Sequence, residues 1–374
     1  MIRPFTPVFL ALAWWFSPPQ AATSAQRDVN AITAGLAADL PRLMEQARVP
    51  GLAIAVIDRG RVAWTRGFGV MRAGGDAAVT ESTRFEAASL SKPVTAYVAL
   101  QLVDAGRLAL DAPLTKYMTY ADLPDDPRAK TMTARHVLSH TTGFANWRRR
   151  DPLKLFFAPG ERFSYSGEGY VYLQRVIETI TGATLEAAAK RMVFEPLGMT
   201  RSTFVNDGAD IASRHTDIGM PLELGPAPSA VNAAASLVTT AADYGRFVAA
   251  AIAGERLKPE TARLMLTPQV QLDNCVMCTT RDRAEPSRDL AWGLGWGLEE
   301  SSEGRVAWHW GDNGGFKNYV AVLLPARRGF VYFTNSDSGL SLRDQIVARV
   351  LGGTHPASRV LDYKQLPGGR QGPS

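Results

Sequence analysis

A serine and a lysine stand three residues apart in the stretch RFEAASLSKPVTAYVALQLVDAG, at Ser89 and Lys92. Residues at i and i+3 of a helix share a face, so this spacing places a hydroxyl beside an ammonium. Pro93 follows directly and fits a helix only in its first turn, where the N–H groups lack intrahelical partners. Burial would favour the neutral amine of Lys92, which could then activate Ser89 as a nucleophile. The pair therefore indicates covalent catalysis by a serine.

This spacing also arises by chance, from a serine that caps a helix and a lysine in solvent. Two further motifs follow in order and weigh against chance. The stretch PGERFSYSGEGYVYL places Tyr165 just before a helix, and WHWGDNGGFKNYVAV places His309, Trp310 and Gly311 on a late strand. The alternative interpretations of these two motifs are a core-packing tyrosine and a cross-strand histidine–tryptophan pair.

The order of the three motifs resembles that of the penicillin-recognising serine hydrolases. The similarity is to the branch that contains class C β-lactamases, serine D-Ala-D-Ala carboxypeptidases, D-aminopeptidases and family VIII carboxylesterases. It spans roughly residues 30–352 and includes four further stretches: TARHVLSHTTGF, EPLGMTRSTF, AAASLVTTAADYGRF and WGLGW. The resemblance implies a β-lactamase/transpeptidase-like α+β fold and a serine hydrolase that uses no cofactor.

The resemblance also implies a role for each motif residue. Ser89 attacks the substrate carbonyl and is acylated, while Lys92 and Tyr165 share the general base and acid work. The backbone N–H groups of Ser89 and Asp312 form the oxyanion hole. The substrate lies along the strand edge at Gly311, where no side chain intervenes. It is a small molecule or a short peptide.

The remaining substrate-binding positions depart from the family pattern. Relatives usually read Tyr-x-Asn, but Gly167 stands here in place of the asparagine that holds a substrate's amide. In the third motif, His309 is expected to face the substrate's carboxylate or the Tyr165 oxygen. Trp310 replaces a small hydroxyl residue, and its side chain could point away from the cleft. We therefore expect an esterase-like enzyme rather than an efficient β-lactamase or D-Ala peptidase, and we expect Gly167→Asn to raise amide hydrolysis. The non-enzyme alternative is a catalytically weak, penicillin-binding-like sensor or binder.

Composition and charge exclude several classes of protein. The chain has 374 residues, 46% hydrophobic, with a formal net charge of +5. Basic residues are scattered, and the short run RRRD at 148–151 is typical of a surface turn, so we expect no nucleic-acid partner. Residues 1–25 resemble a signal peptide, with one charge at Arg3, the apolar core PVFLALAWWF and small residues near a cleavage site at 22–25. No later apolar run could span a bilayer, so we expect an exported protein that is periplasmic or secreted.

Two residue pairs could bind metal or form a covalent link. Cys275 and Cys278 form CVMC, without the helix start of a redox motif or further zinc ligands nearby. In an exported protein this pair favours a local disulfide over free thiols. His136 and His140 have i, i+4 spacing, but no third ligand is evident and the family uses no metal. We expect a packed, hydrogen-bonded pair and no metal site.

The elements that must position these residues follow from periodicity. Residues 29–47 have helical spacing, with Ile32, Leu36, Leu40 and Leu43 on one face, and 51–70 alternate as two strands around a turn at 58–60. Strands return in LGWGLEE, RVAWHWG, KNYVAVLLP and GFVYFTN, followed by a last helix, LRDQIVARVLG. We expect one domain over 26–352, in which both chain ends build an antiparallel sheet flanked by helices. A mainly helical subdomain is inserted at about 90–265, a cleft lies between the two, and 353–374 form a disordered tail.

Overall fold

The computed structural model describes residues 28–148, 150–223, 230–272, 276–277, 279, 287–361 and 366. The helices of these residues are α1 (Val29–Ala47), α2 (Ser91–Asp104), α3 (Ala134–Leu138), α4 (Gly167–Thr181), α5 (Leu185–Ala189), α6 (Ala241–Ala253), α7 (Pro259–Met265) and α8 (Arg343–Val350). The strands are β1 (Gly51–Asp58), β2 (Arg61–Gly69), β3 (Phe85–Glu86), β4 (Val238–Thr239), β5 (Val270–Gln271), β6 (Leu290–Trp292), β7 (Gly297–Ser301), β8 (Gly304–Asp312), β9 (Lys317–Leu323) and β10 (Arg328–Thr334).

Both ends of the chain build one antiparallel sheet, as the sequence predicted. Within the described residues it has eight strands in the order β2-β1-β10-β9-β8-β7-β6-β5. The first strand, β1, pairs with the last, β10, so that Ile54 lies opposite Tyr332. Every residue of β1 is buried, which explains its unbroken apolar run, because helices cover both faces of the sheet. This arrangement, one antiparallel sheet flanked by helices, is the one expected from the sequence.

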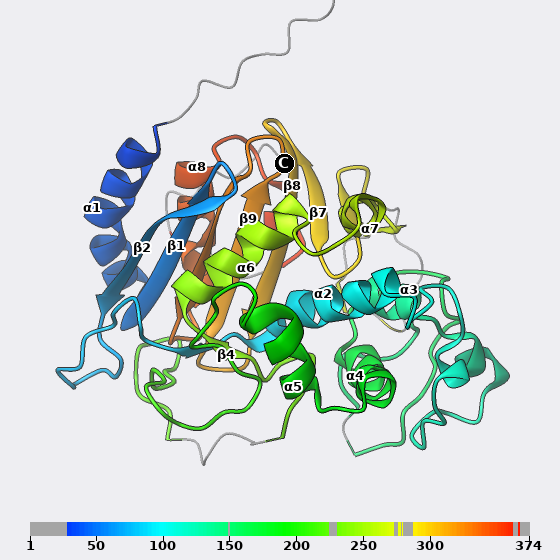
Figure 1. Cartoon of the computed structure of the whole chain (residues 1–374). Coiled ribbons are helices and arrows are strands. Elements are labelled where there is room, and N and C mark those ends of the chain that lie inside the picture. The colour runs from blue at the N-terminus through cyan, green and yellow to red at the C-terminus, as the bar shows by residue number, and fades with distance from the viewer. Residues whose placement is uncertain are drawn as a thin grey trace, which may run out of the picture.

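Alternate residues of β1 divide between two cores. Ala53, Ala55 and Ile57 join the core that contains α2 and α6, whereas Leu52, Ile54 and Val56 join the core of α1 and α8. Figure 1 shows α6 lying across one face of the sheet, with α1 and α8 on the other side. Although α6 falls within the range expected for the inserted subdomain, it packs on β1, β2 and β10. The helices away from the sheet are α2, α3, α4 and α5 (Figure 1).

Helix α2 is buried on every side near its start. The apolar spacing predicted one buried face, but all residues from Ser91 to Leu100 are buried. The helix runs between the sheet layer and the remaining helices, so both sides of it meet protein (Figure 1). Its N-terminal lysine is therefore enclosed.

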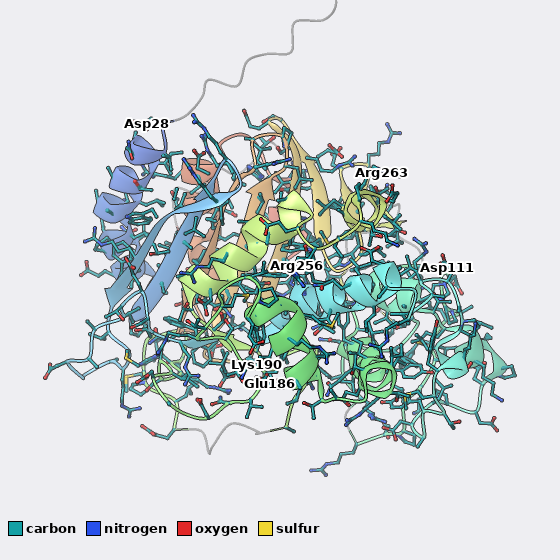
Figure 2. All side chains as sticks on the ribbon, in the orientation of Figure 1. Asp28, Asp111, Glu186, Lys190, Arg256 and Arg263 are labelled. Atoms are coloured by element: carbon teal, nitrogen blue, oxygen red, sulfur yellow. The ribbon has the colours of Figure 1, made fainter. Side chains whose placement is uncertain are left out.

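Charged side chains concentrate at the periphery, as for Asp28, Asp111 and Arg263 in Figure 2. Within the part of the chain that the structure describes, no helix is long and apolar enough to cross a membrane. The signal-peptide range 1–25 lies outside the described residues.

Candidate active site

Ser89 lies in a 3-10 turn, Ala88–Leu90, directly before α2. Ala88 has a left-handed backbone, with φ of 53°, a conformation that costs an L-residue energy and is found at functional sites. The turn is held from both sides: the Ser91 hydroxyl donates to the Ala88 carbonyl at 2.6 Å and accepts from the Leu237 N–H at 2.9 Å. Ser89 itself is only partly buried and can be reached from outside.

Gly311 lets this turn approach strand β8. A Cβ added to Gly311 would lie 2.4 Å from the Ala87 carbonyl oxygen and 3.3 Å from the Ala88 Cβ. The glycine thus makes room for the protein's own serine turn, which brings Ser89 beside the end of β8. Strand β8 pairs with β7 only as far as Trp308. It then continues to Asp312 while pairing with β9 on its other side.

Lys92 is completely buried and points at Ser89. Its Nζ is 3.0 Å from the Ser89 Oγ and 2.9 Å from the Ala234 carbonyl oxygen. Burial lowers the pKa of this lysine well below its ordinary value, because the ammonium loses its hydration. A neutral amine can donate to the Ala234 carbonyl and accept the proton of Ser89. The i, i+3 pairing predicted from the sequence is confirmed in its geometry.

Tyr165 comes to the same place from the residue before the N-cap of α4. Its ring centroid lies 4.6 Å from the Lys92 Nζ. The ring packs against His140 and Trp310, at centroid distances of 4.2 and 4.7 Å. Its backbone N–H donates to the Val276 carbonyl at 2.8 Å. The structure therefore brings Ser89, Lys92 and Tyr165 together.

A cavity of about 110 Å³ opens at Ser89. Its lining consists of Ser89, Asn146, Trp147, Tyr165, Ala235, Met277, Trp310, Asp312 and Asn313. Trp310 thus faces the cavity, although the alternation of the strand allowed it to point away. Asp312, whose N–H was assigned to the oxyanion hole, lines the same cavity as Ser89. Among the described residues that line this cavity, Asp312 is the one whose side chain is ionised.

His309 lies in the core beside the cavity. It is fully buried, its ring lies 6.0 Å from that of Tyr165, and its Nδ1 lies 2.8 Å from the Trp310 carbonyl oxygen. A carbonyl accepts, so Nδ1 carries the proton. Burial, and then the charge of Lys92, lower the His309 pKa to about 3. The histidine is therefore neutral at physiological pH and is not placed as a cation for a substrate carboxylate.

The nearby cations are engaged by acids. Arg214 forms two 2.6 Å contacts with the Glu86 carboxylate, and Lys317 pairs with Asp312 at 2.5 Å. Asn313 connects this network to the cavity, since its side-chain amide donates to Glu86 at 3.0 Å and to the Ala235 carbonyl at 3.1 Å. The sequence offered no sign of this network, because its members come from four separate segments.

Gly167 lies under an aromatic side chain. A Cβ added there would come within 2.5 to 2.8 Å of three atoms of the Trp147 indole. The place of the missing asparagine is therefore filled by Trp147. Sequence analysis missed this residue, since it stands 20 positions before Gly167 and meets it only in the folded chain.

The two histidines at helical spacing serve separate structural contacts. His136 Nδ1 accepts the Thr133 N–H at 3.3 Å within a capping box of α3, and His140 Nδ1 accepts the Ser166 N–H at 3.0 Å. The described residues hold no cluster of three or more His, Cys, Asp or Glu side chains suited to a metal ion. Cys275 and Cys278 lie outside the described residues, but Val276 and Met277 between them contact the site.

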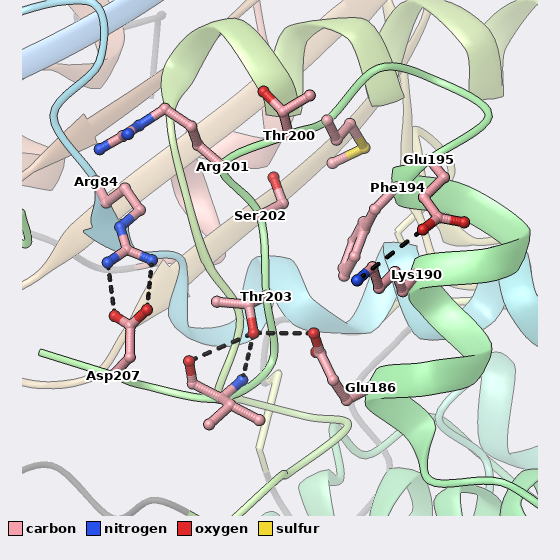
Figure 3. A pocket seen from close by; sticks show the side chains of 12 residues that line it. Arg84, Glu186, Lys190, Phe194, Glu195, Thr200, Arg201, Ser202, Thr203 and Asp207 are labelled. Carbon is pink, nitrogen blue, oxygen red and sulfur yellow. Dashed lines mark hydrogen bonds and ion pairs between the residues drawn. The ribbon is translucent and has the colours of Figure 1, made fainter. Parts of the chain in front are cut away.

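A second cavity, of about 500 Å³, lies away from Ser89 between α5 and the segment 199–207 (Figure 3). Four of its charged side chains form two pairs: Arg84 with Asp207 at 2.6 Å, and Lys190 with Glu195 at 4.0 Å. The Thr203 hydroxyl donates to Glu186 at 3.0 Å. Arg201 and Ser202, also drawn in Figure 3, bind residues outside the lining, Asp210 at 3.1 Å and Asp243 at 3.0 Å. This cavity plays no part in the proposed chemistry.

Comparison with known proteins places the chain in a family. The family model described as Beta-lactamase matches residues 36–352. The chain belongs to the beta-lactamase family. Penicillin-binding protein 4 of Amycolatopsis lactamdurans is 28% identical over 341 residues, which cover 83% of this chain and 87% of that protein. Esterase EstB of Burkholderia gladioli is 31% identical over 221 residues, 49% of this chain and 56% of that protein.

A solved structure agrees on the fold of this beta-lactamase-family chain. The D-alanine carboxypeptidase AmpC from Burkholderia cenocepacia has a TM-score of 0.71 at 23% identity, over 87% of this chain and 99% of that one. The resemblance inferred from the three motifs is thereby confirmed. The relatives' names include a penicillin-binding protein, an esterase and a carboxypeptidase, so the family supports a hydrolase and leaves the substrate to be argued from the site.

Proposed function

We propose that this protein is a serine hydrolase that cleaves small, uncharged esters through an acyl-enzyme on Ser89. The observation that carries the proposal is the contact between a completely buried lysine and a reachable serine, 3.0 Å from Nζ to Oγ. The lowered pKa of Lys92 supports its role as the base, because an amine must be neutral to accept a proton.

The reaction follows from this geometry. Ser89 Oγ attacks the ester carbonyl carbon while its proton passes to the neutral Lys92 Nζ. The carbonyl oxygen becomes an oxyanion, which the N–H groups of Ser89 and Asp312 stabilise. When the acyl–oxygen bond breaks, the leaving alcohol takes a proton from the Lys92–Tyr165 pair. Water then attacks the acyl-enzyme by the same route, which releases the acid and restores Ser89.

The preference for uncharged esters rests on the walls of the cavity. Penicillins and D-Ala-D-Ala peptides carry a carboxylate, and within the described lining the one ionised group is itself an acid, Asp312. The neighbouring cations Arg214 and Lys317 are paired with Glu86 and Asp312. His309 is neutral and buried. One relative is named an esterase, which supports ester hydrolysis.

A rate panel tests the proposal. Purified protein is given p-nitrophenyl acetate, nitrocefin and a D-Ala-D-Ala peptide side by side, with Ser89→Ala as the control. We expect the ester to be hydrolysed with the highest kcat/KM and the control to be inactive. Nitrocefin or peptide turnover above ester turnover would assign the protein to β-lactamases or D-Ala peptidases instead. No turnover of any substrate, with intact fold, would favour the sensor or binder.

We also propose that the protein is exported, on the strength of the N-terminal pattern at 1–25. Expression of the full chain in a bacterial host, followed by N-terminal sequencing of the periplasmic fraction, tests this. A mature N-terminus near residues 22–25 supports export, and an uncleaved cytoplasmic product refutes it.

A further inference from the structure

Trp147 occupies the space that a side chain at position 167 would need, the position at which the family resemblance implies an asparagine. Its indole covers Gly167, so closely that a Cβ on that glycine would lie 2.5 Å from a ring carbon. The same ring lines the Ser89 cavity, and its centroid is 5.9 Å from the Lys92 Nζ. A glycine at position 167 is therefore what lets the indole lie here.

The residues on either side of Trp147 are fastened to the first turn of α4. The Asn146 side-chain oxygen accepts the Gly167 N–H at 2.9 Å, and its carbonyl accepts the Glu168 N–H at 3.1 Å. The Arg148 N–H donates to the Glu168 carboxylate at 3.0 Å, and its side chain pairs with the same carboxylate at 3.4 Å. With both neighbours fixed, the indole is held over the cavity although its own surface is 42% exposed.

Three large apolar side chains from separate segments line the cavity at Ser89: Trp147, Trp310 and Met277. We propose that Trp147 determines acyl-group specificity, closing the cavity to long or amide-bearing acyl chains and leaving room for short, uncharged ones. This inference rests on the proposed ester hydrolysis at Ser89. Its physical basis is steric, since the cavity of about 110 Å³ is bounded by the indole. A second basis is hydrogen bonding, since the face of an aromatic ring gives a substrate amide no full hydrogen-bond partner.

Acyl-chain selectivity tests this role directly. The kcat/KM values for p-nitrophenyl acetate, butyrate and octanoate are measured for the unmodified protein, Trp147→Phe and Trp147→Ala. We expect Trp147→Ala to raise the octanoate-to-acetate ratio by about tenfold or more, the scale that one hydrophobic pocket contact contributes to discrimination. The octanoate-to-acetate ratio of Trp147→Phe should lie between those of the unmodified protein and Trp147→Ala.

Phe156→Ala is the matched control. Phe156 is an aromatic residue of the same segment with a similar exposure, 43%, and it does not belong to the lining of the Ser89 cavity. The octanoate-to-acetate ratio of Phe156→Ala should equal that of the unmodified protein. An unchanged ratio in Trp147→Ala, or an equal change in Phe156→Ala, overturns the inference.

The coupling between positions 147 and 167 provides a second test and revises the expectation for Gly167→Asn. Because an asparagine would collide with the indole, Gly167→Asn alone should lower kcat/KM for every substrate. In the Trp147→Ala background the same change should raise nitrocefin hydrolysis relative to ester hydrolysis by about tenfold, as expected for one restored hydrogen bond. If the effects of the two substitutions simply multiply, the coupling is absent and the inference fails.

Inactivation by organophosphonates separates this inference from the proposed function. Two p-nitrophenyl phosphonates, one with a methyl and one with an octyl group on phosphorus, phosphonylate an activated serine without requiring turnover. Intact mass reports the rate for each. If neither reagent becomes attached, the proposed nucleophile is wrong. If the ratio of the octyl rate to the methyl rate is the same in the unmodified protein and in Trp147→Ala, only the specificity role is wrong.

Discussion

Lys92 is the residue on which the proposed chemistry depends. Its ammonium would be taken out of water on all sides, and its two nearest polar partners, the Ser89 hydroxyl and the Ala234 carbonyl, are uncharged. Because neither partner is a carboxylate that could compensate the charge, the neutral amine is favoured. The same burial that makes Lys92 a base therefore costs the protein stability.

Replacing Lys92 by Met should slow acylation by about two to four decades, the usual scale of general acid–base help. Methionine matches the length of the lysine stem and removes the basic nitrogen while keeping the enclosed site filled. Burst kinetics with p-nitrophenyl acetate measure the acylation rate. A near-normal rate in Lys92→Met would show that another group accepts the Ser89 proton.

The same substitution should change the pH dependence of stability. Because the folded-state pKa of Lys92 is lowered, the unfolded chain binds more protons than the folded one between that pKa and about 10.4. The free energy of unfolding of the unmodified protein should therefore rise with pH across this window, relative to Lys92→Met. Urea unfolding of both proteins at several pH values measures the difference. A difference that stays constant would mean that Lys92 is protonated in the folded state.

His309 should make the protein sensitive to acid. Its pKa of about 3 in the folded state lies below the unfolded value near 6.5, so stability is lost as the pH falls through this range. The loss from one such group is at most about 1.4 kcal/mol per pH unit. His309→Gln keeps a donor for the Trp310 carbonyl but does not titrate, and its unfolding free energy should fall less steeply. Equal slopes for the two proteins would contradict a neutral, buried His309.

At the scale of elements, the site is assembled from turns and loop ends. The Ser89 turn precedes α2, Tyr165 precedes α4, Trp147 follows the HTTGF stretch, and Asp312 ends β8. Ser89, Tyr165 and Asp312 lie just outside or at the end of a regular element, and Trp147 lies in the connection between α3 and α4. The sheet and helices hold the ends of these connecting segments in place, and a side chain at such an end is both positioned and accessible to substrate.

Cys275 and Cys278 flank Val276 and Met277, which contact the site. A bridge between the two cysteines remains a prediction, and it would close a very short loop. Changing both to Ser should therefore alter the free energy of unfolding by only on the order of 1 kcal/mol. Because Val276 accepts the Tyr165 N–H and Met277 lines the cavity, the same change should raise the KM for p-nitrophenyl acetate. An unchanged KM would mean that the loop keeps its shape without the cysteines.

Periodicity predicted the long elements well, and it failed where the decisive contact is tertiary. Strands β1, β2 and β7 to β10 and helix α1 follow from strand-like runs bounded by turns and from helical spacing, whereas β5 and β6 were not predicted. The two-residue strands β3 and β4 are too short to leave a pattern. The apolar residues of α6 indicate a buried face but do not say that the sheet will cover it. Likewise, Ser89 and Lys92 are local neighbours that spacing alone can pair, whereas Trp147 meets Gly167 only through the folded loop.

At the scale of the whole molecule, one sheet made from both chain ends supports a site at its end. β1 and β10 pair along their length, and helices on both faces bury them. β8 carries the third motif past the end of β7 to the serine turn. The catalytic geometry therefore requires nearly the whole chain to be folded, which agrees with a family match over residues 36–352.

The most direct test of this account is the intact mass of the protein during ester turnover. Protein saturated with p-nitrophenyl butyrate is quenched in acid, its intact mass is measured by mass spectrometry, and it is digested to locate any adduct. The account predicts one butyryl group on the peptide that contains Ser89, less of it in Lys92→Met, and none in Ser89→Ala. Hydrolysis without a covalent adduct, together with an active Ser89→Ala variant, would contradict it.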